Sequence, residues 1–135
     1  MNNSERVEEF MKAMGQGINL PFSSDLIDLR VDLLSEELTE YIDEVQQVYR
    51  FIDLRQQPSN NLKAALTKEL ADILYVVYGF GLTFGLPLQE VFEEVHHSNM
   101  SKLGEDGKPI YREDGKVLKG PNYQPPELEK YFEIS

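Results

Sequence analysis

Apolar residues recur at helical spacing along the first half of the chain. The first group predicts a helix that begins near Ser4, which can cap it, and ends at Gly15. After a loop that contains Pro21, a second group predicts a long helix from Ser24 or Asp25 to about Leu54. The steps of this second stripe alternate between four and three residues, close to the 3.6-residue period of an α-helix. The stripe consists of Ile27, Val31, Leu34, Leu38, Tyr41, Val45, Val48 and Ile52.

A third helix is predicted from about Asn61 to Phe84, and its pattern differs from that of the second. From Leu70 onward it is apolar almost all round, which is typical of a helix buried on every side. Gly85 closes this helix, and Pro87 suits the first turn of a fourth helix that ends near Gly104.

The residues after the fourth helix no longer show apolar positions at helical spacing. The turn signal Asp114-Gly115 predicts a small hairpin between residues 110–112 and 116–118, and a last short helix is expected from Glu127 to Phe132. We therefore expect one all-α domain over residues 1–135, of four-helix-bundle type, with a helical core at 1–104 and a tail of hairpin and extended chain at 105–135.

Composition narrows the functions that this fold can serve. The 135 residues include no Cys, which excludes a disulfide framework, a thiolate metal site and a Cys nucleophile. The net charge of −11 leaves no basic stripe for a nucleic-acid duplex, so we expect no nucleic-acid partner. The polar start of the chain and the broken apolar run at 73–89 predict no signal peptide and no membrane span. A cytoplasmic location is expected.

The acidic residues of the second helix fall into two groups on a helical wheel. Glu37, Glu40 and Glu44 lie together on one flank of the apolar stripe, whereas Glu36 and Asp43 lie on the side that faces solvent. Like charges three and four residues apart repel one another. A positive partner is therefore expected beside the first group.

The third helix carries a second acidic pair. Glu69 and Asp72 are three residues apart and share a face of a helix that is otherwise apolar. Burying carboxylates without partners costs several kcal/mol each. Two such pairs on neighbouring helices form an oxygen-rich site that suits Mg²⁺, with Mn²⁺ as a substitute. A di-iron site is disfavoured, because neither pair has the histidine three residues on that such bundles use.

Each acidic pair also has a simpler interpretation. A Glu-x-x-Glu pattern on a helix is usually a solvated face. The Glu69–Asp72 pair could instead be neutralised by Lys68, Arg50 or Arg55 in a structural ion pair. For Glu44, solvent exposure and support of a metal ligand are both compatible with its position.

These motifs together resemble a known family. The segment Glu36-Glu37-Leu38-Thr39-Glu40, followed by Glu69-Leu70-Ala71-Asp72, is similar to the E-E-x-x-E and E-x-x-D signature of the all-α nucleoside triphosphate pyrophosphohydrolases. This superfamily includes MazG-like proteins, dimeric dUTPases and phosphoribosyl-ATP pyrophosphohydrolases. Asn99-Met100-Ser101-Lys102 resembles the N-x-x-K element of MazG-like members, and the tail is similar to that of small stand-alone members.

The resemblance implies a fold, a reaction and a set of site residues. It implies a MazG-like fold in which Glu37, Glu40, Glu69 and Asp72 coordinate Mg²⁺, supported by Glu36 and, in one interpretation, Glu44. Water would attack the α-phosphorus of a nucleoside triphosphate and release pyrophosphate, with Glu37 or Glu40 as the general base.

Five further residues are expected to bind the substrate. Asn99 and Lys102 lie on one face of the fourth helix, where Lys102 would contact phosphate and Asn99 sugar or phosphate. An ordinary surface lysine near a helix end is the alternative for Lys102. Lys119 and Tyr123 lie in the locally basic tail, and Gln16 lies in the loop that contacts the base in similar proteins.

The expected assembly is a homodimer or a tetramer, because a single copy has too few helices to cover the apolar third helix. The expected substrate is a deoxynucleoside triphosphate with purine slightly favoured, and dUTP or a damaged nucleotide is an alternative. Two other functions remain open at this point. The chain could be a non-catalytic nucleotide- or metal-binding regulator with the same fold, or a structural helical module with surface acids.

Overall fold

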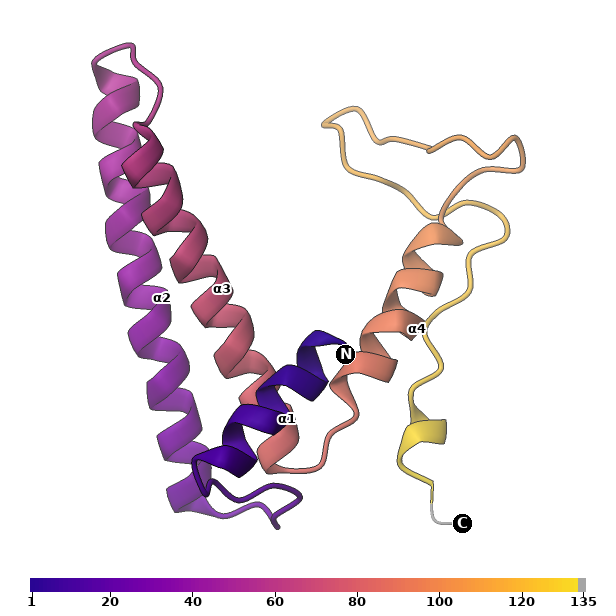
Figure 1. Cartoon of the computed structure of the whole chain (residues 1–135). Coiled ribbons are helices and arrows are strands. Elements are labelled where there is room, and N and C mark those ends of the chain that lie inside the picture. The colour runs from indigo at the N-terminus through magenta and orange to yellow at the C-terminus, as the bar shows by residue number, and fades with distance from the viewer. Residues whose placement is uncertain (134–135) are drawn as a thin grey trace. The chain divides into compact units, whose positions relative to one another are not determined.

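The chain folds into four helices and one short turn of 3-10 helix. The computed structural model describes residues 1–133 and shows α1 (Asn3–Ala13), α2 (Ser24–Asp53), α3 (Asn60–Thr83), α4 (Leu88–Met100) and η1 (Glu129–Tyr131) (Figure 1). The predicted all-α class and the four predicted helices are confirmed. The chain divides into two compact units, one from Met1 to Leu86 and one from Pro87 onward.

In the first unit, α2 and α3 lie side by side and are joined by the loop 54–59, while α1 packs against α3 (Figure 1). Two serines begin the long helices. The Ser23 hydroxyl accepts a hydrogen bond from Leu26 N at 3.3 Å, and the Ser59 hydroxyl accepts one from Leu62 N at 3.2 Å. The two helices therefore start at residues whose side chains satisfy free backbone donors.

The start of α1 differs from the prediction. Asn2, and not Ser4, caps the helix, because its side chain accepts from Glu5 N at 2.8 Å. The Glu5 carboxylate in turn accepts from Asn2 N at 3.4 Å, which completes a capping box. The sequence contains both residues of this box at the required spacing, so the signal was present.

The loop that follows α1 is docked on the end of α3. Asn19 N donates to Leu82 O at 2.9 Å, and Leu20 N donates to Thr83 O at 2.7 Å. The rings of Phe22 and Phe84 stack with centroids 4.3 Å apart. These contacts hold residues 14–23 against the C-terminal turn of α3.

The second unit consists of α4 and the tail that folds back along it (Figure 1). The buried Ser98 hydroxyl donates to Gln124 O at 2.7 Å, and Gly120 N donates to Lys102 O at 2.8 Å. A side chain at Gly120 would collide with the backbone of Leu103. The tail is therefore held by backbone contacts that require a glycine at this position.

Three details of this unit depart from the sequence predictions. Helix α4 ends at Met100, so residues 101–104 form turns rather than helix. The predicted hairpin is reduced to one antiparallel bridge between Tyr111 and Val117 around the predicted turn. The predicted last helix is the 3-10 turn η1, shorter at both ends. Short strands with one bridge and no covering layer have little to stabilise them.

Within the described residues, no single helix is long and apolar enough to cross a membrane, although α3 and α4 taken together meet that test on length and composition.

Candidate metal centre

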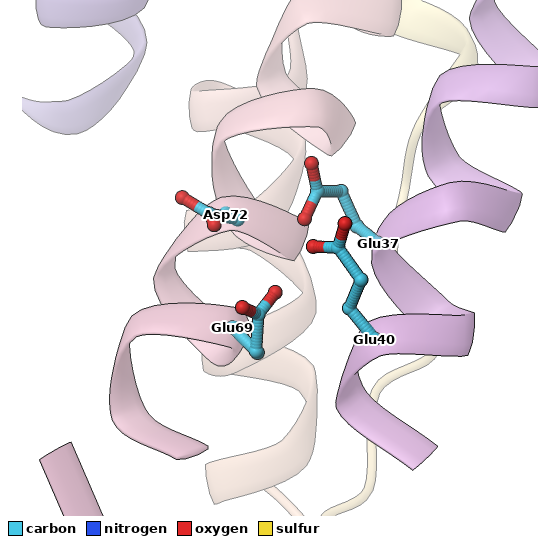
Figure 2. Close-up of side chains that lie close together, drawn as sticks. All are labelled: Glu37, Glu40, Glu69 and Asp72. Carbon is cyan, nitrogen blue, oxygen red and sulfur yellow. The ribbon is translucent and has the colours of Figure 1, made fainter. Parts of the chain in front are cut away.

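Four carboxylates from α2 and α3 converge in the first unit. Glu37 and Glu40 lie on α2, Glu69 and Asp72 lie on α3, and the four side chains lie close together (Figure 2). One oxygen from each side chain can be chosen so that all four atoms lie within 4.8 Å of one another. The structure thus brings together the four residues that the sequence singled out as metal ligands.

Helix geometry explains why these four meet. Each pair is separated by three residues and so occupies one face of its helix. The helices α2 and α3 are antiparallel. The first residue of each acidic pair therefore lies opposite the second residue of the other pair, so that Glu37 faces Asp72 and Glu40 faces Glu69.

The cluster is strongly perturbed electrostatically. Burial, followed by the negative charges of Glu40 and Asp72, raises the pKa of Glu37 from 4.5 to about 7. Burial and a hydrogen bond with Glu40 also raise the pKa of Glu69. In the absence of a cation, Glu37 and Glu69 therefore hold a proton more readily than ordinary carboxyl groups do.

Two oxygens of the cluster lack the partners that buried oxygens need. The Oε2 atoms of Glu37 and Glu69 are both buried and have no hydrogen-bond donor within the described part of the chain. The Glu69 side chain as a whole is only 12% exposed. Leaving a buried polar group without a hydrogen-bond partner is destabilising, and more so for a charged group. A divalent cation with oxygen ligands fits this donor set, since it would satisfy both atoms at once.

The alternative of a structural ion pair is realised only in part. Lys68 Nζ lies 2.7 Å from Asp72 and 4.0 Å from Glu69, but the lysine side chain is 70% exposed. Arg50 instead donates to Gln47 at 3.3 Å. An exposed ion pair four residues apart on a helix contributes little to stability, because solvent screens it. Lys68 therefore does not compensate for the burial of the other carboxylates.

The other predicted residues of α2 lie outside the group of four. Glu36 is exposed, as the helical wheel indicated. Glu44 is partly buried one turn beyond Glu40. Their predicted supporting role stays a prediction.

The predicted substrate-binding residues are divided between the two units. Gln16 is exposed in the loop after α1, and Asn99 is exposed near the end of α4. Lys102 is partly buried just after α4, and its carbonyl oxygen binds the tail. Lys119 Nζ lies 4.8 Å from the centre of the Tyr123 ring, an arrangement typical of a cation–π contact.

Sequence reasoning missed one residue of the first unit. Arg30 is only 9% exposed and is the buried residue of α2. Two signals in the sequence could have drawn attention to it. It is the sole basic residue between Lys12 and Arg50, and it precedes Glu37 by seven residues, which places both on the same face of the helix.

Comparison with known proteins gives a match to one family model. The sequence model of the phosphoribosyl-ATP pyrophosphohydrolase family matches residues 5–99. The chain is 32% identical over 124 residues to the uncharacterized protein L479 of Acanthamoeba polyphaga mimivirus. That match covers 87% of this chain but only 42% of the viral protein, so the chain spans less than half the length of this relative.

A solved structure is similar along nearly the whole chain. It is the crystal structure of a suspected NTP pyrophosphohydrolase from Exiguobacterium sp. 255-15, with 25% sequence identity and a TM-score of 0.48. The match covers 98% of this chain and 94% of that one. The family match is the decisive finding, because it spans α2 and α3 together with all four carboxylates. The chain belongs to the phosphoribosyl-ATP pyrophosphohydrolase family, within the MazG-like NTP pyrophosphohydrolase superfamily.

Proposed function

We propose that this protein hydrolyses a nucleoside triphosphate to the monophosphate and pyrophosphate in a reaction that depends on Mg²⁺. The observation that carries the proposal is the pair of buried, unpartnered oxygens on Glu37 and Glu69 within a group of four converging carboxylates. A scaffold helix has no reason to bury such a group. Family membership supports the same reaction class.

In the proposed reaction, Glu37, Glu40, Glu69 and Asp72 would hold the cation, with Mn²⁺ as a substitute for Mg²⁺. A bound divalent cation would supply charge neutralisation to the phosphates and to the leaving pyrophosphate. Water adds to the α-phosphorus while the bond from that phosphorus to the bridging oxygen of the β-phosphate breaks. The proton of the water passes to a carboxylate, for which Glu37 or Glu40 is the candidate.

The substrate is proposed to be a deoxynucleoside triphosphate with a purine base slightly favoured, and dUTP or a damaged nucleotide is the alternative. The family name does not identify the substrate of this protein. The family model matches residues 5–99, and the tail from residue 105 onward, which carries the proposed substrate-binding residues Lys119 and Tyr123, lies beyond that range. Asn99, Lys102, Lys119 and Tyr123 are proposed to bind sugar and phosphate, and Gln16 to contact the base. A cytoplasmic location stays a prediction.

We also propose that the protein works as a homodimer or a tetramer. Helices α2 and α3 leave large apolar side chains exposed, including Ile42 at 50% and Leu74 at 53%. Contiguous apolar surface on a protein of this size commonly marks a binding surface. Sedimentation at micromolar concentration tests the assembly, and a monomer would contradict it.

The central experiment measures pyrophosphate release from a panel of NTPs and dNTPs, with Mg²⁺ and with chelator. Asp72→Asn replaces one carboxylate ligand with an uncharged and weaker amide, and Asp43→Asn makes the same chemical change at an exposed position of α2 as the matched control. We expect release that needs Mg²⁺, is unchanged in the control and falls about 100-fold or more with Asp72→Asn. A folded, metal-binding protein that releases no pyrophosphate would instead support the non-catalytic regulator.

A further inference from the structure

Arg30 is a buried cation without a carboxylate partner. Its guanidinium is packed between α2 and α3, and within residues 1–133 no acidic side chain lies at ion-pair distance from it. The Nε atom is buried with no acceptor, and burial lowers the pKa of the side chain. Burying a guanidinium in this way is costly, so its retention calls for an explanation.

The opposite helix is shaped to admit this side chain. Gly79 of α3 faces Arg30, and a Cβ atom at Gly79 would lie 2.9 Å from Nη1 of the arginine. Gly79 is seven residues after Asp72, just as Arg30 is seven residues before Glu37. Arg30 therefore lies on the same α2–α3 interface as the carboxylates, two helical turns or roughly 10 Å along the axis from Glu37.

Within the part of the chain that the structure describes, the Arg30 side chain donates a hydrogen bond to the side chain of Gln16. Nη2 donates to Oε1 of Gln16 at 3.4 Å. The backbone of Gln16 is held as well, because its N–H donates to Met11 O at 2.8 Å and Gly15 N donates to Lys12 O at 3.1 Å. With Gly15 at a φ of 71°, this is a Schellman motif at the end of α1.

The contact determines which way the Gln16 amide is turned. A guanidinium has only donors, so the atom of Gln16 that faces it must be the carbonyl oxygen. Rotating the amide by half a turn would set the NH₂ group against the guanidinium, donor against donor. The NH₂ group is consequently directed away from Arg30, and Gln16 itself is exposed.

We propose that Arg30 is a positioning residue that makes Gln16 present N–H donors to the substrate, and that this selects a nucleobase with a carbonyl oxygen on its edge. The inference rests on the proposed function and narrows its substrate class. Guanine, hypoxanthine, uracil and thymine carry a carbonyl where adenine and cytosine carry an amino group. An amino group would face the Gln16 NH₂ as donor against donor and leave both unsatisfied.

The test compares nucleotides that differ chiefly in this group. The ratio of kcat/KM for dITP over dATP, and for dUTP over dCTP, measures the preference for carbonyl over amino bases. We expect the wild-type protein to prefer the carbonyl base by roughly tenfold in each pair. Gln16→Glu presents only acceptor oxygens and should reverse the preference. Gln16 is exposed, so the Gln16→Glu variant should fold even if a substitution of the buried Arg30 prevents folding.

Two substitutions of Arg30 separate positioning from simple packing. Arg30→Met keeps an unbranched side chain without donors, frees the amide to rotate and should bring both ratios close to one. Arg30→Lys keeps a donor-only group and should retain the preference. Equal loss of kcat/KM on all four nucleotides in Arg30→Met, with both ratios unchanged, would show a purely structural role and overturn the inference. An unchanged ratio in Gln16→Glu would overturn it as well.

Equilibrium binding of the same four nucleotides in the presence of Mg²⁺ makes the two proposals distinguishable. If no nucleotide releases pyrophosphate, the proposed function fails, while a tighter binding of dITP and dUTP that is reversed in Gln16→Glu would still support the role of Arg30. If pyrophosphate is released but neither binding nor turnover distinguishes the two members of each pair, the inference fails and the proposed function stands.

Discussion

The charge on Glu37 can be tested through the stability of the metal-free protein. Glu37→Gln removes one negative charge from the four carboxylates while preserving the shape of the side chain. Burial and the charges of Glu40 and Asp72 raise the pKa of Glu37 from 4.5 to about 7. The folded protein therefore holds this proton more tightly than the unfolded chain does. Without metal, the contribution of this proton to stability is fully present below pH 4.5 and is lost as the pH rises through about 7.

The size of the effect follows from that pKa. The difference between 4.5 and about 7 corresponds to roughly 3 kcal/mol. Glu37 is only partly buried, so solvent screening reduces this to about 1–2 kcal/mol. In chelator at pH 8, we expect Glu37→Gln to raise the free energy of unfolding by about that amount relative to wild type. At pH 4 the two proteins should be nearly equal, because both are neutral at this position.

The assay is urea unfolding at pH 4 and pH 8 in chelator, repeated at pH 8 with Mg²⁺. In wild type, Mg²⁺ should raise the free energy of unfolding at pH 8, and in Glu37→Gln most of this gain should disappear, since an amide is a weaker ligand. Asp43→Asn, an exposed change on the same helix, controls for the general effect of charge. A Glu37→Gln variant that is less stable than wild type at pH 8 in chelator would refute the reasoning. The reasoning would also be refuted if Mg²⁺ raised the free energy of unfolding of Glu37→Gln by as much as it raises that of wild type.

Three further predictions address Lys68, the apolar surface and Lys102. Lys68→Ala should leave the free energy of unfolding in chelator almost unchanged, measured by urea unfolding, and should tighten Mg²⁺ binding in calorimetry, because the exposed lysine competes for Asp72. A clear loss of stability with no change in Mg²⁺ binding would favour the structural ion pair. Leu74→Glu, at an exposed apolar position, should shift the sedimenting species toward monomer, and an unchanged assembly would exclude this face as the interface. Lys102→Ala should raise KM for the nucleotide about tenfold, and unchanged kinetics would remove Lys102 from the substrate site.

The helices and the sorting of the acids could be predicted because both depend on short-range geometry. A 3.6-residue period fixes which side chains share a face, so Glu69 and Asp72 had to lie together once α3 was a helix. The long uninterrupted stripe of α2 predicted its bounds within a residue. The cap at Asn2 was missed because Asn2, Asn3 and Ser4 can all serve as caps, and only the reciprocal bond with Glu5 distinguishes Asn2.

The tail was predicted less well for a related reason. The turn signal Asp114-Gly115 indicated where the chain reverses, and the bridge from Tyr111 to Val117 lies around it. The number of residues that pair in a hairpin depends on whether another element covers its strands. Residues near the turn in the sequence do not determine this. The hydrogen bonds that join Gly120 to Lys102 and Gln124 to Ser98 likewise link residues that are 18 and 26 positions apart.

The sequence by itself determined that there are four helices and that two of them each carry a pair of acids on one face. Only the tertiary structure decided that the two pairs meet, because the antiparallel register of α2 and α3 is set by packing along their whole length. The same register decided the burial of Arg30 against Gly79 and its bond to Gln16. Helical periodicity determines which side chains share one face of a helix. Which other helix packs against that face depends on the free energy of packing segments that are distant in the sequence, and a local sequence pattern does not contain that information.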